Sequence, residues 1–371
     1  MKRAVLFSFL LSSMLALVPA RAQTAFEVVP FSSDRWKVEG EYKLEDYRNA
    51  QSLYLPQGGK ALLPDAQFLN GIIEFDIAFS QERGFKGLRF RAQDDTNYEE
   101  FYFRSHQSGN PDAMQYTPVF NGVAAWQLYY GENHSTAYSY KDNEWMHIKL
   151  AVQDQRMEVF IDNMEVPVLY VYDLKMKAES GPLGLYSMGS VRFANFKYQP
   201  TDSYTFTSKA RAFPRLAVGT INNWEVSNAF AEEAIAQQPQ LKQDFIDQLK
   251  WQKLESEFTG ITNLARVAQL AEGKNTVIAK VKITSDKKQL KKLEFGYSDV
   301  ARVYCNNTIL YEGQRVFRSR DYRYLGTIGY FDSIYLPLEK GENEIYMIVT
   351  ENFGGWGIMA RMEDSEGVAL K

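Results

Sequence analysis

The chain has 371 residues and a formal net charge of −4, and 14% of its residues are aromatic. A mildly acidic protein without a basic stripe is not expected to bind nucleic acid, because the phosphate backbone requires clustered lysine and arginine. The length exceeds one ordinary hydrophobic core and predicts two domains. The single cysteine, Cys305, excludes an internal disulfide, so the stability of the domains must come from their cores.

Residues 1–22 have the pattern of a secretory signal peptide. The basic start Met1-Lys2-Arg3 precedes an almost wholly apolar run over 4–18, and small residues follow up to Ala22. Such a run is too short to span a bilayer, and no later apolar run is long enough either. We expect cleavage after Ala22 and export to the bacterial periplasm or the outside of the cell. Export without disulfides is typical of bacterial proteins of this kind.

Residues 24–200 contain many short runs in which apolar and polar residues alternate, separated by turn residues. One run extends over 71–80, and a hairpin pattern extends over 145–161. Strand side chains alternate between two faces, so these runs predict an antiparallel β-sandwich. The apolar face of the first run consists of Ile73, Phe75, Ile77 and Phe79.

The stretch over 97–126 has the densest set of ligand-type side chains. In its leading strand Phe101 and Phe103 alternate with Tyr102 and Arg104, so we expect Arg104 on the face away from the core. Planar donors and acceptors next to aromatic rings suit sugar recognition. The alternative is a half-buried strand with a solvated face and a hydrogen-bonded loop. The predicted ligand-binding residues are Arg104, His106, Asp112, Gln115, Tyr116, Asn121 and Trp126.

Two other groups in this part of the chain are weaker candidates. Glu74 and Asp76 share one strand face and are candidates for the carboxylate pair of a glycosidase, or they form a solvated face. Asp94, Asp95 and Asn97 are candidates for binding calcium through oxygen ligands, or they form a plain turn. We expect no other cofactor, because three scattered histidines and one cysteine give little support for a zinc site.

The motif Trp-x-His-Ile-Lys-Leu-x-Val over 145–152, Glu-Val-Phe-Ile-Asp over 158–162 and Gly-Ile-Ile-Glu-Phe-Asp over 71–76 resemble the laminin-G-like, concanavalin-A-like lectin/glucanase superfamily. The resemblance implies a jelly-roll sandwich, and this fold includes lectins, glucanases and interaction modules. The family called 3-keto-disaccharide hydrolase has a similar sandwich. Glucanases of the superfamily use Glu-x-Asp-x-x-Glu, but Phe79 stands at the last carboxylate position here. The resemblance therefore does not support retaining glucanase activity.

Residues 201–222 contain proline and glycine and are predicted to form a linker. Residues 223–371 begin with a helical interval over 228–256, in which Pro239 suits the first turn of a second helix. Alternating strand patterns follow to the end. We expect the helical interval to pack on the sheets through a stripe at helical spacing that consists of Leu241, Phe245, Ile246, Leu249 and Leu254.

The segments over 295–306 and 336–344 resemble the galactose-binding-like jelly-roll. That fold occurs as an accessory domain of glycosidases and as a carbohydrate-binding module, so the resemblance implies a second sandwich. Arg320 and Trp356 are the candidates for a second sugar platform in this domain. The alternative for Trp356 is a plug at the end of the sandwich or a contact with the first domain.

The sequence thus predicts a mainly β protein with two antiparallel β-sandwich (jelly-roll) domains and a short helical segment that covers the second. We expect a secreted, non-catalytic carbohydrate-binding or surface-interaction protein whose partner is a glycan or an envelope protein. One alternative is a glycan-active hydrolase that uses Glu74, Asp76 or Asp112 as acid and base. Another is a protein–protein interaction module of an envelope assembly.

Overall fold

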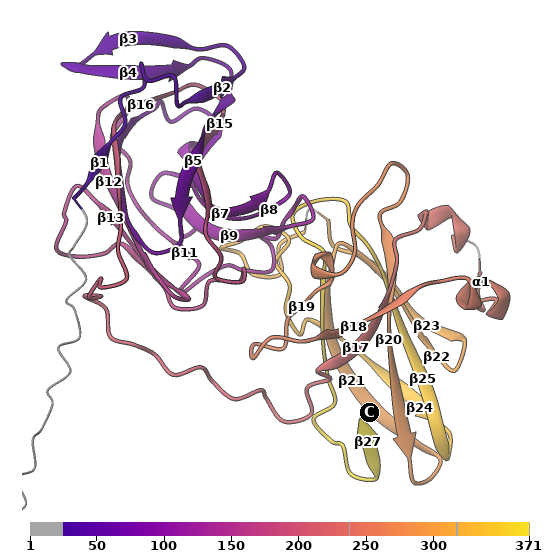
Figure 1. Cartoon of the computed structure of the whole chain (residues 1–371). Coiled ribbons are helices and arrows are strands. Elements are labelled where there is room, and N and C mark those ends of the chain that lie inside the picture. The colour runs from indigo at the N-terminus through magenta and orange to yellow at the C-terminus, as the bar shows by residue number, and fades with distance from the viewer. Residues whose placement is uncertain (1–24, 237, 317, 371) are drawn as a thin grey trace, which may run out of the picture.

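The computed structural model describes residues 25–236, 238–316 and 318–370, and the predicted signal peptide lies outside them. The described residues form two β-sandwiches joined by an extended segment (Figure 1). The prediction of a mainly β protein with two antiparallel sandwiches is therefore confirmed. None of the helices in these ranges is long and apolar enough to cross a membrane.

The first sandwich consists of two antiparallel sheets of eight strands each. Sheet A has the order β14 (Leu169–Val171), β13 (Arg156–Ile161), β12 (Met146–Gln153), β6 (Gly71–Ala78), β16 (Val191–Pro200), β4 (Ala50–Leu55) and β3 (Lys43–Tyr47), and β1 (Glu27–Val28) pairs with β16. Sheet B has the order β10 (Val123–Ala124), β9 (Met114–Phe120), β8 (Asn97–Arg104), β7 (Phe85–Asp94), β15 (Gly181–Met188), β5 (Gly59–Phe68) and β2 (Lys37–Glu39), and β11 (Ser135–Thr136) pairs with β9.

The core of the first sandwich contains the apolar face of each alternating strand. Phe75 and Ile77 of β6 meet Phe101 and Phe103 of β8 in one fully buried cluster. Because strand side chains alternate, Tyr102 and Arg104 must point away from this core. We call the side of sheet B that faces away from the core its outer face.

The second sandwich pairs a sheet of seven strands with a sheet of four. Sheet D has the order β18 (Trp251–Glu255), β17 (Asn223–Ser227), β20 (Thr276–Ser285), β25 (Gly341–Thr350), β22 (Val300–Cys305) and β23 (Thr308–Gln314), and β27 (Val368–Leu370) pairs with β20. Sheet C has the order β19 (Thr262–Asn263), β26 (Gly357–Arg361), β21 (Gln289–Ser298) and β24 (Asp332–Leu338).

The helical segment covers the second sandwich but is shorter than predicted. It contains a 3₁₀ turn over Glu232–Ala234 and one helix, α1 (Gln243–Asp247), which begins four residues after Pro239. The prediction that Leu254 belongs to a helical stripe was wrong. Leu254 lies on β18 opposite Trp224, because pairing with β17 satisfies the backbone of this segment and places Leu254 in the sandwich core. Leu241 and Ile246 of the predicted stripe are buried on sheet D together with Phe230 and Ile235, and Phe245 and Leu249 of the stripe pack there partly buried.

The segment between the sandwiches has no strand from residue 201 to residue 222, and part of it is fastened to the first sandwich. The buried carboxylate of Glu158 on β13 accepts hydrogen bonds from the Tyr204 hydroxyl at 3.0 Å and from the Thr207 backbone amide at 3.1 Å. The Thr207 hydroxyl adds a third at 2.9 Å. The predicted linker therefore contains a segment that lies along sheet A before it reaches the second sandwich (Figure 1).

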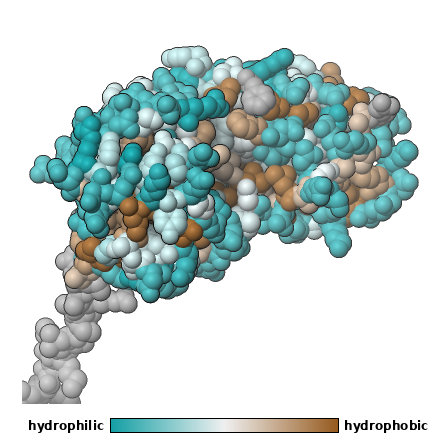
Figure 2. Space-filling model, turned by 90° about the horizontal axis from the view of Figure 1, so that it is seen from above, coloured by the Kyte–Doolittle hydropathy of each residue, from teal (hydrophilic) through white to brown (hydrophobic). Residues whose placement is uncertain are grey.

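The two sandwiches touch through the loop over 125–131, which follows β10. Ala125, Leu128 and Tyr129 pack against Ile261 and Ile328 of the second sandwich. The hydroxyl of Tyr130 also donates a hydrogen bond of 2.6 Å to the Ile328 carbonyl. Hydrophobic residues show only in separate patches on the face drawn in Figure 2, some of them along the line where the two lobes meet.

Candidate functional site

The outer face of sheet B presents rows of polar and aromatic residues across its central strands. Residues that are directly opposite each other in paired strands share one face of a sheet, so the register defines these rows. The strands β7, β8 and β9 lie on the flank of the first sandwich that is nearest to the second (Figure 1). The first row is Met188, Phe85 and Arg104, the second is Tyr186, Gly87, Tyr102 and Gln115, and the third is Gly184, Arg89, Glu100 and Thr117.

Gly87 allows the ring of Tyr186 and the neighbouring strand β8 to lie close to the middle of the face. A Cβ atom on Gly87 would lie 2.8 Å from the Cε1 atom of Tyr186 and 2.8 Å from the Cβ atom of Tyr102. It would also lie 2.4 Å from the Phe101 carbonyl oxygen. Only glycine therefore permits this approach of the Tyr186 ring and of strand β8 to β7.

Glu100 is a buried carboxylate in the third row. Its residue is 7% exposed, and its Oε1 atom accepts a hydrogen bond of 2.6 Å from the Tyr186 hydroxyl. The Nε atom of Arg89 is 3.9 Å from Oε2, and the Arg89 guanidinium lies over the rings of Tyr98 and Tyr186 at 4.2 and 5.1 Å. Burial raises the pKa of Glu100 above its ordinary value, although the Tyr186 hydroxyl and Arg89 oppose the shift. This carboxyl is therefore suited to hold or transfer a proton.

Four of the predicted ligand-binding residues form one network at the end of β8. Arg104 donates to the Gln115 side-chain oxygen at 2.8 Å and forms an ion pair with Asp112. Its guanidinium carbon lies 5.1 Å from the centre of the Trp126 ring. The hydroxyl of Tyr102, which sequence reasoning did not select, accepts a further hydrogen bond of 2.9 Å from Arg104.

Gln115 also holds the loop that carries Trp126. Its side-chain amide donates to the carbonyl of Trp126 at 2.8 Å and to the carbonyl of Tyr129. The hydrogen-bonding groups of Gln115 are thus engaged within the protein, whereas Asp112 and Trp126 keep part of their surface exposed. The network therefore positions a half-buried indole and a carboxylate whose side chain is 14% exposed at the edge of the outer face.

The other three predicted residues lie apart from this network. His106 is half-buried and packs edge-on against Phe85, with ring centres 5.5 Å apart. Burial, together with nearby arginines, lowers the pKa of His106. The ring of Tyr116 lies in the core, because Gln115 occupies the outward position of β9. Asn121 donates a hydrogen bond of 2.8 Å to the Ala265 carbonyl and so belongs to the contact between the sandwiches.

The weaker carboxylate candidates, Glu74 and Asp76, lie on sheet A rather than on sheet B. Both pair with His147 of β12, whose Nδ1 atom is 2.6 Å from Asp76 and whose Nε2 atom is 3.4 Å from Glu74. Hydrogen bonds with Asp76 and then with Glu74 raise the pKa of His147 to about 9. Lys197 lies 2.7 Å from Glu74. The two carboxylates therefore belong to an ion-paired ladder on the outside of sheet A.

The candidate calcium ligands form the turn between β7 and β8. The Asp94 carboxylate accepts hydrogen bonds of 2.7 Å from the Thr96 amide and hydroxyl and of 3.0 Å from the Asn97 side chain. These hydrogen bonds with Thr96 and Asn97 lower the pKa of Asp94. Within the described parts of the chain, no three His, Cys, Asp or Glu side chains cluster as a metal site.

The two candidates of the second sandwich do not share a surface. Trp356 is 0% exposed, and its indole N–H donates a hydrogen bond of 3.1 Å to the Val349 carbonyl inside the core. Arg320 donates to the Phe331 carbonyl at 2.7 Å on the exposed side. Trp356 therefore fills the sandwich, as the alternative interpretation of the sequence proposed.

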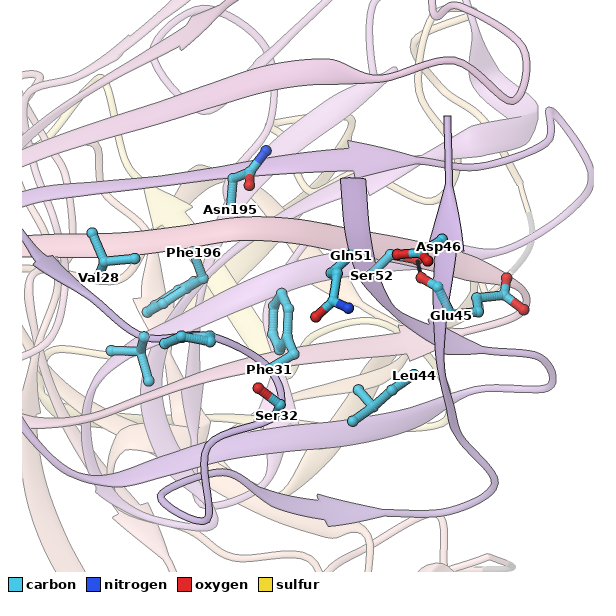
Figure 3. A pocket seen from close by; sticks show the side chains of 12 residues that line it. Val28, Phe31, Ser32, Leu44, Glu45, Asp46, Gln51, Ser52, Asn195 and Phe196 are labelled. Atoms are coloured by element: carbon cyan, nitrogen blue, oxygen red, sulfur yellow. Dashed lines mark hydrogen bonds between the residues drawn. The ribbon is translucent and has the colours of Figure 1, made fainter. Parts of the chain in front are cut away.

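A cavity of about 280 Å³ lies elsewhere, between β1 and the β3–β4 hairpin of sheet A (Figure 3). Phe31, Phe196 and Gln51 line it, together with Asn195 and Glu45. The Asn195 amide is engaged with Asp76 at 2.6 Å and Glu45 with Arg192 at 2.7 Å. The cavity includes no residue of the predicted set, and its polar groups are partly occupied.

Sequence reasoning missed Glu100, Arg89, Tyr98 and Tyr186. The alternation that assigned Arg104 to the outer face also assigns Glu100 and Tyr98 to it, because they are two and three steps of two residues away on the same strand. The sequence pattern of β8 was therefore sufficient to select Glu100 and Tyr98. The place of Tyr186 depends on the pairing of β15 with β7, which lie almost a hundred residues apart in the chain.

Comparisons with known proteins agree with the fold of the first sandwich. Residues 32–199 match the model of a family described as the 3-keto-alpha-glucoside-1,2-lyase-like domain. The predicted concanavalin-A-like fold is therefore confirmed for this part of the chain, which contains the whole outer face of sheet B. No curated protein sequence matches the chain.

Several solved structures are similar to part of the chain. The carbohydrate-binding module CBM66 from Bacillus subtilis is 16% identical, covers 48% of this chain and 97% of its own, and has a TM-score of 0.34. The Bacillus licheniformis β-glucanase is 10% identical, covers 49% of this chain and 100% of its own, and has a TM-score of 0.35. Sheep galectin-11 is 8% identical, with coverages of 39% and 98% and a TM-score of 0.29.

Proposed function

We propose that the outer face of sheet B binds a glycoside, in a protein exported to the periplasm or the cell exterior. The single observation that carries the proposal is the row in which the Tyr186 ring lies against Gly87 and its hydroxyl donates to the buried carboxyl of Glu100. The family match of this domain, whose printed name refers to α-glucosides, supports the choice of ligand class.

The chemistry of this face suits a sugar ring. The half-buried ring of Trp126 offers apolar surface to the C–H side of a pyranose, and carboxylate and guanidinium groups pair with its hydroxyls. Arg89 and Asp112 retain exposed surface at the two sides of the rows. The ion pair of Arg104 with Asp112 keeps the acceptor oxygens of Asp112 oriented.

Titration calorimetry of the mature chain with trehalose, sucrose and maltose tests the proposal. We expect Glu100→Gln to weaken binding roughly tenfold, since a buried charged partner contributes about 1.5–3 kcal/mol to a hydrogen bond. Glu74→Gln is the matched control, because it makes the same change on the outside of sheet A. Equal affinities of the unaltered chain, Glu100→Gln and Glu74→Gln for these sugars would reject the site. The absence of binding by the unaltered chain would also reject it.

A second candidate function is cleavage of the bound glycoside, and the raised pKa of Glu100 is the observation that favours it. In a 1,2-elimination from a 3-keto-α-glucoside, a base removes the proton from C2 next to the ketone. The C1–C2 double bond forms, and the C1–O bond breaks with its electron pair on the glycosidic oxygen, which gains a proton. A carboxyl whose pKa is raised by burial accepts a proton more readily than an ordinary carboxylate and therefore suits the base.

Chromatographic detection of the released aglycone from a 3-keto-α-glucoside tests this second function. We expect the rate to fall by about 10²–10⁴ in Glu100→Gln, the usual contribution of a general base, and to stay unchanged in Glu74→Gln. Release at equal rates in the variant and the unaltered chain would exclude Glu100 as the base.

A further inference from the structure

We infer that the second sandwich supplies the far end of this site through Phe353, and that the ligand is an oligosaccharide that crosses Trp126 from one sandwich to the other. This inference rests on the proposed binding of glycosides to the outer face of sheet B. It assigns a role in specificity to a residue that lies outside the domain matched by the family model.

The rings form a continuous series across the contact between the sandwiches. Trp126 lies between two groups, with the Arg104 guanidinium 5.1 Å and the Phe353 ring 5.2 Å from its ring centre. The planes of Trp126 and Phe353 are at 81° to each other. Arg104 in turn lies 5.4 Å from the Tyr102 ring, so the series begins in the middle of the outer face.

The turn that carries Phe353 is shaped to the Trp126 ring. Gly354 has φ +92°, and a Cβ atom there would lie 2.5 Å from the Cζ2 atom of the indole. The Gly354 carbonyl accepts a hydrogen bond of 2.9 Å from the Gln127 amide, and the Ser298 hydroxyl donates one of 2.7 Å to the Gln127 side chain. The relative position of the two rings is therefore fixed by direct bonds between the sandwiches.

Exposure distinguishes Phe353 from the aromatic residues that only join the sandwiches. Tyr129 is fully buried in that contact, whereas Phe353 is 37% exposed and Trp126 is half-buried. Two adjacent rings that keep exposed surface at the contact between the sandwiches are suited to contact a ligand.

The length of the surface sets the size of the ligand. Tyr186, Tyr102 and Gln115 are 7%, 4% and 1% exposed, so the open part of this surface begins at Asp112 and Trp126. The contacts of Arg104 with Trp126 and of Trp126 with Phe353 extend the surface further. Two partly exposed rings whose centres are 5.2 Å apart can each contact a different sugar, so the surface fits a chain of more than one sugar.

Calorimetric titration with α-linked gluco-oligosaccharides of two, four and six units tests the inference on the mature chain. We expect the unaltered chain to bind the longer probes roughly tenfold more tightly than the disaccharide, as one further aromatic contact contributes. Phe353→Ala should lose this increment and keep the affinity for the disaccharide. Phe353→Trp should retain the increment. Tyr335→Ala, at an exposed ring on β24, is the matched control and should bind as the unaltered chain does.

Three results would overturn the inference. Affinities that are independent of length in the unaltered chain would remove the need for a far end. An equal loss of affinity for short and long probes in Phe353→Ala would mean that Phe353 supports the contact between the sandwiches and does not touch the ligand. A lack of binding to every probe by the unaltered chain would overturn the glycoside proposal itself and this inference with it, whereas the first two results leave that proposal intact.

Discussion

Two buried carboxyl groups, those of Asp299 and Glu351, lie beside the contact between the sandwiches and make the stability of the protein depend on pH. Burial raises the pKa of Asp299 to about 6, and burial together with the nearby Asp299 raises that of Glu351 to about 8. The Oδ2 atom of Asp299 accepts a hydrogen bond of 2.8 Å from the Asn352 amide, directly before Phe353. In the described structure the Oε2 atom of Glu351 has no hydrogen-bond partner.

We expect stability to fall as the pH rises from about 4.5 to about 8, because folded Glu351 binds its proton more tightly than the unfolded chain does. Its contribution is present at low pH and is lost as the folded group ionises. Glu351→Gln removes this titration, so the difference in unfolding free energy between pH 5 and pH 9 should become smaller than in the unaltered chain. Chemical unfolding at both pH values measures it. An unchanged difference would mean that Glu351 titrates in the folded state as it does in the unfolded state.

At the scale of elements, local alternation could be predicted from the sequence and long-range pairing could not. The pattern Phe101, Tyr102, Phe103, Arg104 correctly separates the core face of β8 from its outer face. The same reasoning on β9 would have assigned Tyr116 to the core had the strand boundary been known. The place of Tyr186 over Gly87 depends on the pairing of distant strands, which no local pattern encodes. Leu254 fits both a helical stripe and a strand, and only the pairing with β17 decides between them.

The close approach of strands β7 and β8 at Gly87 predicts that a larger residue at this position destabilises the first sandwich. Gly87→Ala should lower the unfolding free energy by about 1–3 kcal/mol, the usual cost of overpacking, because the new Cβ would collide with backbone and ring atoms. Urea unfolding measures the change. Gly273→Ala is the control for the added methyl group at a glycine with open space around it, although its positive φ carries a separate backbone cost. A Gly87→Ala protein of unchanged stability would contradict the close packing of Tyr186 and Tyr102.

At the scale of the whole molecule, a buried ion-pair network ties the sandwiches together. Lys175 of the first sandwich contacts Asp173 and Glu257, and Glu257 belongs to the second. The Tyr129 hydroxyl donates to the same Glu257 carboxylate. Removal of one member of such a buried group is costly, because it leaves unpaired charge inside the contact.

Lys175→Met should therefore destabilise the protein by about 3–5 kcal/mol and weaken the coupling between the sandwiches. Denaturant unfolding followed by tryptophan fluorescence measures both effects, since loss of coupling separates one transition into two. Lys177→Met is the matched control, as Lys177 pairs with Glu179 on the surface and should change stability by less than about 1 kcal/mol. Equal effects of the two changes would show that the contact does not depend on Lys175.

A crystal of residues 23–371 with a bound α-linked gluco-oligosaccharide tests most directly the proposal that the outer face of sheet B binds a glycoside. We predict electron density for the sugar along the row of Tyr186, Gly87 and Tyr102 and onward to Trp126. Density in the cavity between β1 and the β3–β4 hairpin, or against the Glu74 ladder of sheet A, with the outer face of sheet B empty would contradict the proposal.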